Sequence, residues 1–108
     1  MQRGELYRIR KPPGDPKQHR IFLIVSRQWL IDSRFSTVMC APVFTSGQGL
    51  TTQVSIGINE GMKHESWVFC DGLTSVRKVD LTHYVGLLSA AKMSEVEAAL
   101  AMALDLRL

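Results

Sequence analysis

Cysteine is scarce in this sequence, and its pattern argues against a metal centre. The chain has two cysteines, Cys40 and Cys70, and neither forms a Cys-x-x-Cys pair or stands beside a histidine. Zinc sites need several such ligands at short spacings. Both cysteines lie in apolar segments, so we predict reduced thiols that pack as small hydrophobic side chains. We expect neither a metal nor a cofactor.

Long apolar runs are absent as well. No run approaches the roughly 20 residues that cross a membrane. The first ten residues, MQRGELYRIR, lack the apolar region of a signal peptide. We therefore expect a cytoplasmic protein with no membrane segment.

The composition is that of one globular domain with a basic beginning. The 108 residues are 45% hydrophobic, and no repeat or linker divides them, so we interpret residues 1–108 as a single domain. Residues 1–20 hold six basic and two acidic residues, a net charge of +4. The whole chain has a net charge of +3, so the other 88 residues together carry −1. This asymmetry favours a surface that faces a polyanion, although an ordinary solvated terminus has the same composition.

The first half of the chain has the pattern of short strands. Residues 4–10 and 20–26 predict two strands, joined by the Pro- and Gly-rich loop KPPGDPK. The run RIFLIVS is continuously apolar, which predicts a strand buried on both faces. Residues 27–35 fit either a short helical turn or an irregular crossover.

Further strands are expected before the pattern changes. Residues 36–44 predict a strand in which Pro42 marks an edge position or a bulge. Residues 51–58 alternate in polarity, which predicts one wet face. The run SWVFCDGLTSV (66–76) predicts one or two strands, broken near its Asp-Gly step.

The last segment has a helical period. Ser94 begins a capping-box pattern, and Ser89 is a competing start. The apolar positions that share one helix face are Met93, Val96, Leu100, Ala103 and Leu104. Five or six strands and a helix at about 93–106 predict a mainly β fold, a small and strongly bent β-barrel with a C-terminal helix packed on it.

Several landmarks follow one another in a recognisable order. RGELYRI begins the chain, and HRIFLIVS follows a Pro/Gly loop. APVFTS comes next, then NEGMKHESWVFCDGL leading to VGLLS, and finally VEAALAMALDL. Together they resemble MazF/PemK-type toxins, the ribonuclease half of type II toxin–antitoxin systems. The resemblance covers nearly the whole chain and rests on the order and spacing of these segments.

The resemblance implies both a fold and an activity. The fold is an SH3-like barrel of the CcdB/Kid/MazF kind, assembled as a homodimer. The activity is sequence-specific, metal-independent cleavage of single-stranded RNA, which leaves 5′-hydroxyl and 2′,3′-cyclic phosphate ends. The partner is a cognate antitoxin whose flexible tail occupies the RNA groove. By position, the arginine before the second strand is Arg20, and the Thr or Ser after the third apolar strand is Thr45.

The chain also departs from the pattern of these toxins. Ile21 stands where a proline is usual, and Gly72 stands where a Gln often follows the acidic residue of the late strand. The loop PPGDPKQH replaces a Gly-Ser-Glu-Gln-like loop. These differences suggest altered base preference or weakened activity. Two alternatives therefore stay open: a gyrase-poison-like protein that docks on a topoisomerase, and a catalytically inactive SH3-like binding module.

The implied chemistry needs a cation at the phosphate rather than a metal. Attack by a 2′-hydroxyl adds negative charge to the phosphate in the transition state. Arg20 suits that charge because guanidinium presents a planar fork of donors, although it is a poor general base. Thr45 can donate a hydroxyl hydrogen bond to the same phosphate, with support from Ser46. His19 is an alternative proton shuttle. The simpler interpretation is that Arg20 is a solvated residue at a strand end and that Thr45 supplies an ordinary turn hydroxyl.

A second group of residues is predicted to bind the RNA strand. The candidates for phosphate contacts are Arg8, Arg10, Lys11 and Lys17. Gln48 could read base edges, and Trp29 could stack on a base, although packing is the simpler role for this Trp. We interpret His64 as a surface residue, and His83 as either a structural residue or one at the entry to the helix. A cationic groove also predicts that the antitoxin segment is acidic and extended.

Overall fold

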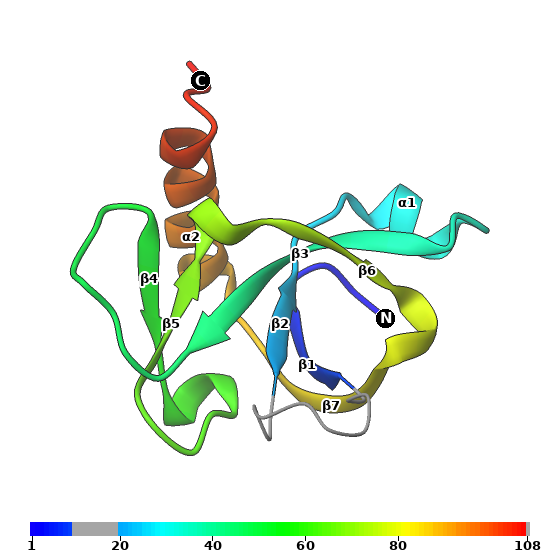
Figure 1. Cartoon of the computed structure of the whole chain (residues 1–108), viewed down its shortest axis with the longest axis horizontal. Coiled ribbons are helices and arrows are strands. Elements are labelled where there is room, and N and C mark those ends of the chain that lie inside the picture. Colours follow the sequence, from blue (N-terminus) through cyan, green and yellow to red (C-terminus); the bar gives the residue numbers. More distant parts are fainter. Residues whose placement is uncertain (10–19, 108) are drawn as a thin grey trace.

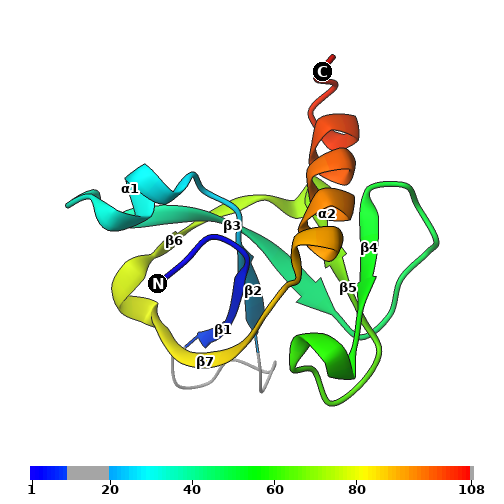
Figure 2. The same ribbon diagram turned by 180° about the vertical axis from the view of Figure 1, so that it is seen from behind.

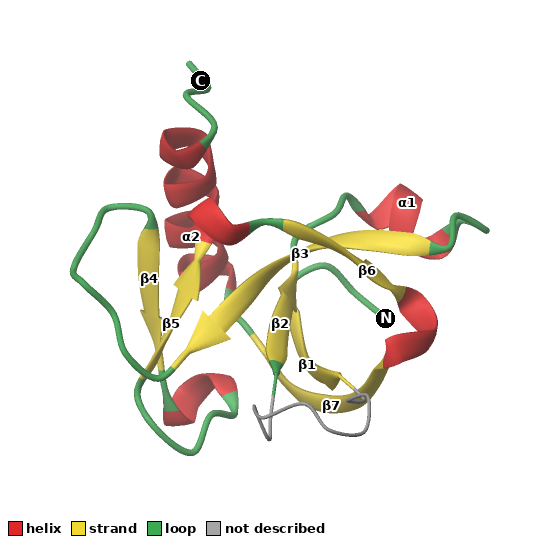
Figure 3. Ribbon diagram, in the orientation of Figure 1, coloured by secondary structure: helices red, strands yellow, loops and turns green. Residues whose placement is uncertain are grey.

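The computed structural model describes residues 1–9 and 20–107; residues 10–19 and 108 lie outside the described part. Figures 1 and 3 show how its strands and helices are arranged. In chain order, the elements are β1 (Glu5–Ile9), β2 (Ile21–Ile24), α1 (Gln28–Asp32), β3 (Thr37–Phe44), β4 (Gln53–Ile56), the 3₁₀ turn η1 (Ile58–Glu60), β5 (Ser66–Phe69), η2 (Cys70–Gly72), β6 (Thr74–Arg77), η3 (Lys78–Asp80), β7 (Leu81–Leu87) and α2 (Ala90–Ala103).

The strands form one strongly bent antiparallel sheet. Their hydrogen-bonded order is β4-β5-β3-β2-β1-β7, and β6 also pairs with β3. The long strand β3 links the two halves of the sheet (Figure 1). The predicted class, mainly β with a C-terminal helix and a strong bend, is confirmed. Among the described strands the path is open, with β4 and β7 at its ends, so the sheet bends without closing into a barrel.

Strand β3 is central, so of the two possibilities predicted from Pro42, an edge position or a bulge, the edge position is wrong. On one side β3 pairs with β2, including Pro42 opposite Phe22. On the other side, pairing with β6 ends at Cys40 and pairing with β5 begins at Val43. Pro42 falls between these two partners, where a residue without an N–H group is tolerated.

Strand β2 is buried on both faces, as its continuous apolar sequence predicted. Alternate side chains of a strand point to opposite faces, and each face of β2 enters a different core. Leu23 and Val25 belong to a first cluster, which also contains Val54, Val68, Val96 and Ala99. Phe22 and Ile24 belong to a second cluster, which also contains Ile31, Val38, Cys40, Val76 and Leu81. Helix α2 supplies Val96 and Ala99 and so covers only the first cluster (Figure 2).

The two cysteines are buried free thiols, as predicted. Burial raises the pKa of the Cys40 thiol to about 12. Burial, helped by the neighbouring Asp71 carboxylate, raises the pKa of Cys70 to about 11. At neutral pH both groups therefore remain protonated and act as core side chains.

Helix α2 starts earlier than the preferred prediction. Its N-cap is Ser89, whose hydroxyl oxygen accepts a hydrogen bond from the Lys92 N–H at 3.1 Å. The competing start at Ser89 is thus confirmed, and the start at Ser94 is wrong. Leu104, which we placed on the apolar face, lies beyond the helix and is exposed. No helix among the described residues is long and apolar enough to span a membrane.

Strand β7 was missed, as was the 3₁₀ turn before it. Its sequence, LTHYVGL, shows neither an apolar run nor clean alternation, and four of its seven residues are exposed. Pairing with β1 forms it, from Glu5 opposite Leu87 to Ile9 opposite Leu81, with two shifts of register. The five or six predicted strands are therefore seven in the described chain.

Candidate active site

The start of β2 and the end of β3 lie side by side in the sheet. Ile21 pairs with Val43. The next position outward on each strand therefore holds Arg20 and Phe44, and Thr45 is one residue further along. The backbones of the two predicted catalytic residues are thus at the same end of the sheet, and both residues are exposed. The cross-strand neighbour of Arg20 is Phe44 rather than Thr45.

Arg20 is anchored through its backbone. The N–H of Ile9 donates to the Arg20 carbonyl at 2.9 Å, which extends the β1–β2 ladder to this residue. A guanidinium on a paired backbone moves less than one on a free loop, which suits a group that must meet a phosphate. Direct cross-strand neighbours share a face of the sheet, so Arg20 and Phe44 lie on the same face.

Turn η2 borders this face next to Phe44. A Cβ atom on Gly72 would lie 3.0 Å from Pro42 Cγ, so the turn packs closely against β3. The departure at Gly72 therefore has a packing reason in this chain. The adjacent Asp71 carboxylate accepts a 2.6 Å hydrogen bond from the Thr52 hydroxyl, which ties η2 to the start of the β4 hairpin.

A pocket of about 480 Å³ opens next to Thr45. Thr45 and Ile21 line one part of it, and Arg8 lies on β1. The remaining walls come from residues 61–64, Ser66 and residues 83–85 of β7. Arg8 pairs with Ile21 on one side and with His83 on the other, so one row of cross-strand neighbours crosses the pocket.

The pocket is cationic. Arg8 and Lys63 line it together with two histidines, His64 and His83, and none of the described lining residues is acidic. The Arg8 Nε atom is buried, and no described group accepts a hydrogen bond from it. A buried charged donor without an acceptor is costly, which makes an anionic ligand favourable at this position.

Two glycines bring the loop after η1 onto β7. A Cβ atom on Gly86 would lie 1.9 Å from the Glu60 carbonyl oxygen, and one on Gly61 would lie 2.4 Å from the Val85 carbonyl oxygen. Gly61 also has a φ of +96°, which favours glycine. The loop then reaches His64, whose carbonyl accepts a 3.0 Å hydrogen bond from the buried Ser66 hydroxyl. Lys63 and His64 are therefore held over the pocket by this crossing.

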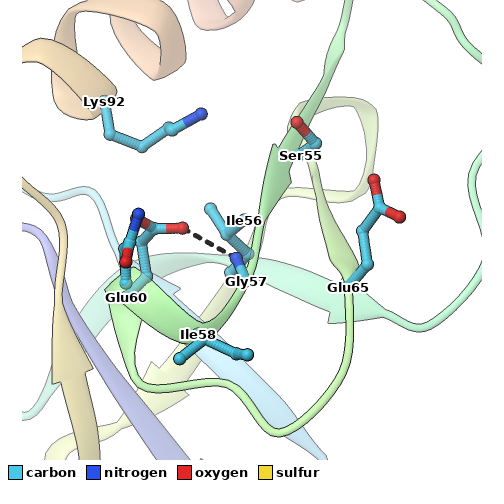
Figure 4. A pocket seen from close by; sticks show the side chains of 8 residues that line it. Ser55, Ile56, Gly57, Ile58, Glu60, Glu65 and Lys92 are labelled. Carbon is cyan, nitrogen blue, oxygen red and sulfur yellow. Dashed lines mark hydrogen bonds between the residues drawn. The ribbon is translucent and has the colours of Figure 1, made fainter.

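A second hollow, of about 360 Å³, lies beside η1 (Figure 4). It is lined by Glu60, Glu65 and Lys92 among others, so carboxylates outnumber cations there. The Glu60 carboxylate accepts a 2.7 Å hydrogen bond from the Gly57 N–H and caps η1. This hollow suits an anionic ligand less than the pocket beside Thr45 does.

The structure does not bring all predicted RNA-binding residues to one place. Trp29 lies on α1, beyond the far end of β2 from Arg20, and its exposed ring has the Arg27 guanidinium 5.6 Å from its centroid. Gln48 is in the exposed 45–52 loop, where its N–H donates to the Gln53 side chain at 2.7 Å. Ser46 is exposed in the same loop. The predicted residues His19, Arg10, Lys11 and Lys17 lie outside the described residues.

Sequence reasoning missed several residues at this end of the sheet. Lys63 and Tyr84 line the pocket, and Tyr84 is exposed with its ring edge-on to Tyr7 at 5.8 Å. Phe44 was read as the last apolar residue of a strand. The sequence signal that could have found Lys63 is its place in a loop, because binding residues lie disproportionately on loops that a rigid scaffold positions.

These features define a class: a small, strongly bent antiparallel β protein with a C-terminal helix and a cationic pocket at one end of its sheet. The family model described as a PemK-like, MazF-like toxin of type II toxin-antitoxin systems matches residues 2–104. The chain therefore belongs to this toxin family.

Individual relatives agree with this assignment. Endoribonuclease MazF3 of Mycobacterium tuberculosis is 30% identical over 87 residues, which cover 81% of this chain and 84% of that protein. The structure is similar to that of the Mycobacterium tuberculosis toxin MazF-mt6, with a TM-score of 0.83 at 25% identity, covering 96% of this chain and 99% of that one. A mycobacterial endoribonuclease in complex with its cognate antitoxin also gives a TM-score of 0.83 at 26% identity, and the match covers 98% of this chain and 96% of that one.

Proposed function

We propose that this protein cleaves single-stranded RNA at the end of the sheet where Arg20, Phe44 and Thr45 meet. As a member of the PemK/MazF-like toxin family, the chain is an endoribonuclease of a toxin–antitoxin system. The observation that supports this position for the site is the Ile21–Val43 pair, which brings the backbones of both predicted catalytic residues to one end of the sheet, where Thr45 lines a cationic pocket.

The proposed reaction uses the RNA's own 2′-hydroxyl as the nucleophile. The 2′-oxygen attacks the adjacent phosphorus, the bond to the 5′-oxygen breaks, and the products carry a 2′,3′-cyclic phosphate and a 5′-hydroxyl. Arg20 stabilises the extra negative charge on the phosphate oxygens, and Thr45 donates a hydroxyl hydrogen bond. The mechanism requires no metal ion.

The pocket would hold the phosphate next to the cleaved one. Arg8 carries the buried Nε donor and Lys63 carries a point charge, so each can contact a phosphate oxygen. Tyr84 offers an exposed ring at the same pocket for a flanking base. These three residues therefore position the strand without taking part in the chemistry.

We also propose the assembly and location that the family resemblance implies. The protein acts in the cytoplasm as a homodimer, and its cognate antitoxin presents an acidic, extended segment to the cationic surface. Light scattering coupled to gel filtration measures the dimer directly. Co-purification from the native operon identifies the antitoxin, and a partner with a basic tail would contradict the proposed groove.

One assay tests the activity and separates it from the alternatives. Purified protein is incubated with mixed-sequence single-stranded RNA in EDTA, and the new ends are mapped. We expect cleavage with 5′-hydroxyl and cyclic phosphate ends, and a loss of at least roughly 100-fold in rate for Arg20→Ala. Arg34→Ala, an exposed arginine after α1, is the matched control and should keep the wild-type rate.

Each other outcome has a meaning. Binding without cleavage would favour an inactive binding module. Toxicity in cells without RNA binding or cleavage would favour a topoisomerase poison. Wild-type cleavage by folded Arg20→Ala protein would remove Arg20 from the mechanism.

A further inference from the structure

An aromatic side chain occupies the position opposite Arg20. Phe44 ends β3, and 39% of its surface is exposed. Its ring meets Phe69 edge-on, with the centroids 4.8 Å apart and the planes at 76°. The Phe69 ring supports Phe44 from the neighbouring strand β5, where the pairing runs from Val43–Val68 to Phe44–Trp67. We call Phe44 with its supporting Phe69 the aromatic platform.

The platform lies next to the cation that the proposed reaction needs. The Ile21–Val43 pair is the last described rung between β2 and β3, and the next positions outward are Arg20 and Phe44. Directly opposed side chains in a sheet have Cβ atoms about 4.5–5.5 Å apart and share one face. A phosphate bound by Arg20 therefore has its own nucleoside within reach of the Phe44 ring.

The surroundings leave Phe44 rigid. Turn η2 packs on Pro42, two residues earlier on the same strand, where a Cβ atom on Gly72 would lie 3.0 Å from the proline ring. Edge-on packing against Phe69 restricts rotation of the Phe44 ring. A rigid, partly exposed ring loses little conformational entropy when a base stacks on it.

We propose that Phe44 is the base-stacking residue for the nucleotide next to the cleaved phosphate. This inference rests on the proposed function and gives the role first considered for Trp29 to a residue adjacent to Arg20. Stacking tolerates every base, because each has a π-face, so Phe44 fixes the position of the base without reading its edge. The chemistry is unchanged: Phe44 aligns the nucleoside so that its 2′-hydroxyl attacks in line with the leaving 5′-oxygen.

The test compares Phe44→Leu, which keeps an apolar side chain, with Phe44→Trp, which keeps a stacking ring. Phe35→Leu is the matched control, because Phe35 is an exposed phenylalanine just before the opposite end of the eight-residue strand β3. Affinity is measured for an RNA made uncleavable by a single 2′-deoxy nucleotide. We expect Phe44→Leu to weaken binding roughly 5- to 150-fold, the range for one stacked base, and Phe44→Trp and Phe35→Leu to bind within about 3-fold of wild type.

An abasic scan separates stacking from a merely structural role. Removing one base at a time should reveal one position at which the wild-type protein loses RNA affinity. At that position Phe44→Leu protein should lose little further affinity, because its base no longer stacks on Phe44. Additive losses at every position would overturn the proposal, as would unchanged affinity of Phe44→Leu. These binding measurements do not depend on cleavage: wild-type protein that binds but never cuts RNA would contradict the proposed function instead. Circular dichroism and thermal melting confirm that each variant is folded.

Discussion

The register of two strands decides how three residues, Arg20, Phe44 and Thr45, are arranged. Each stands at or just outside the end of a paired strand, and the Ile21–Val43 pair decides which of them face each other. The family resemblance pointed to Arg20 and Thr45 as partners, and their residue types agree, because a guanidinium and a hydroxyl both suit a phosphate. The ladder adds Phe44 between them, and it separates the proposed roles into charge, hydrogen bonding and stacking.

The hydroxyl of Thr45 can be tested without changing its shape. Thr45→Val removes the donor but keeps a β-branched side chain, so we expect a roughly 10- to 100-fold slower single-turnover cleavage with nearly unchanged RNA affinity. Thr45→Ser should restore most of the rate. A Thr45→Val rate equal to wild type would show that the hydroxyl does not contact the reacting phosphate.

Thiol reactivity gives a prediction for the two cysteines. Burial raises the pKa of Cys40 to about 12 and that of Cys70 to about 11, so at pH 8 almost none of either thiol is the reactive thiolate. Ellman's reagent should therefore react slowly with native protein and rapidly, at both cysteines, in guanidinium chloride. Rapid reaction of a native thiol at pH 8 would contradict this burial.

At the scale of elements, close backbone approach places the loop that carries Lys63 and His64. Gly86 of β7 touches the backbone of Glu60 and Gly61, so neither strand nor loop can accept a side chain at the crossing. The start of α2, by contrast, has a local cause, because the Ser89 hydroxyl accepts a hydrogen bond from the Lys92 N–H of the first turn.

Gly86→Ala tests the crossing. A methyl group 1.9 Å from the Glu60 carbonyl oxygen must displace the loop, so we expect a loss of about 2 kcal/mol or more in the free energy of unfolding, together with weaker RNA binding. Gly57→Ala is the matched control, since no atom lies within 4 Å of its Cβ position. Urea denaturation measures both variants, and equal stability would show that the loop is not tightly held.

The helix cap gives a second prediction at this scale. Ser89→Ala should lower the free energy of unfolding by about 1 kcal/mol, because it removes the N-cap acceptor. Ser94→Ala, at an exposed site within the helix, should change it by less than about 0.5 kcal/mol. The reverse order in urea denaturation would place the start of the helix at Ser94.

At the scale of the whole molecule, charge is distributed unevenly between the two hollows. The pocket beside Thr45 combines Arg8 and Lys63 without an acidic lining residue among those described, whereas the hollow beside η1 combines Glu60 and Glu65 with one lysine. An RNA strand or an acidic antitoxin segment should therefore follow the first surface and avoid the second.

Salt dependence measures this preference. We expect the logarithm of the RNA affinity to fall linearly with the logarithm of salt concentration, and Arg8→Ala and Lys63→Ala each to reduce the slope by about 1. Arg34→Ala should leave the slope unchanged, because Arg34 lies in the exposed turn after α1. An unchanged slope for both pocket variants would mean that the RNA phosphates bind elsewhere.

Most strands and the helix could be predicted from the sequence because their patterns are local. Continuous apolar residues in β2 required burial on both faces, and alternation in β4 required one wet face. Strand β7 could not be predicted, because its residues become a strand only through pairing with β1. The place of Pro42 in a central strand could not be predicted either, because it falls in the gap between the two partner strands β6 and β5.

The sequence by itself determined the mainly β class, the terminal helix, the family and the choice of Arg20 and Thr45 as candidates, since composition, period and motif order are properties of neighbours along the chain. The tertiary structure decided which side chains meet. It set Phe44 opposite Arg20, brought Arg8 together with Lys63 and His83 around one pocket, and left Trp29 at the far end of β2. The physical reason is that strand register and the Gly61–Gly86 crossing join residues far apart in the chain, and no local pattern encodes those contacts.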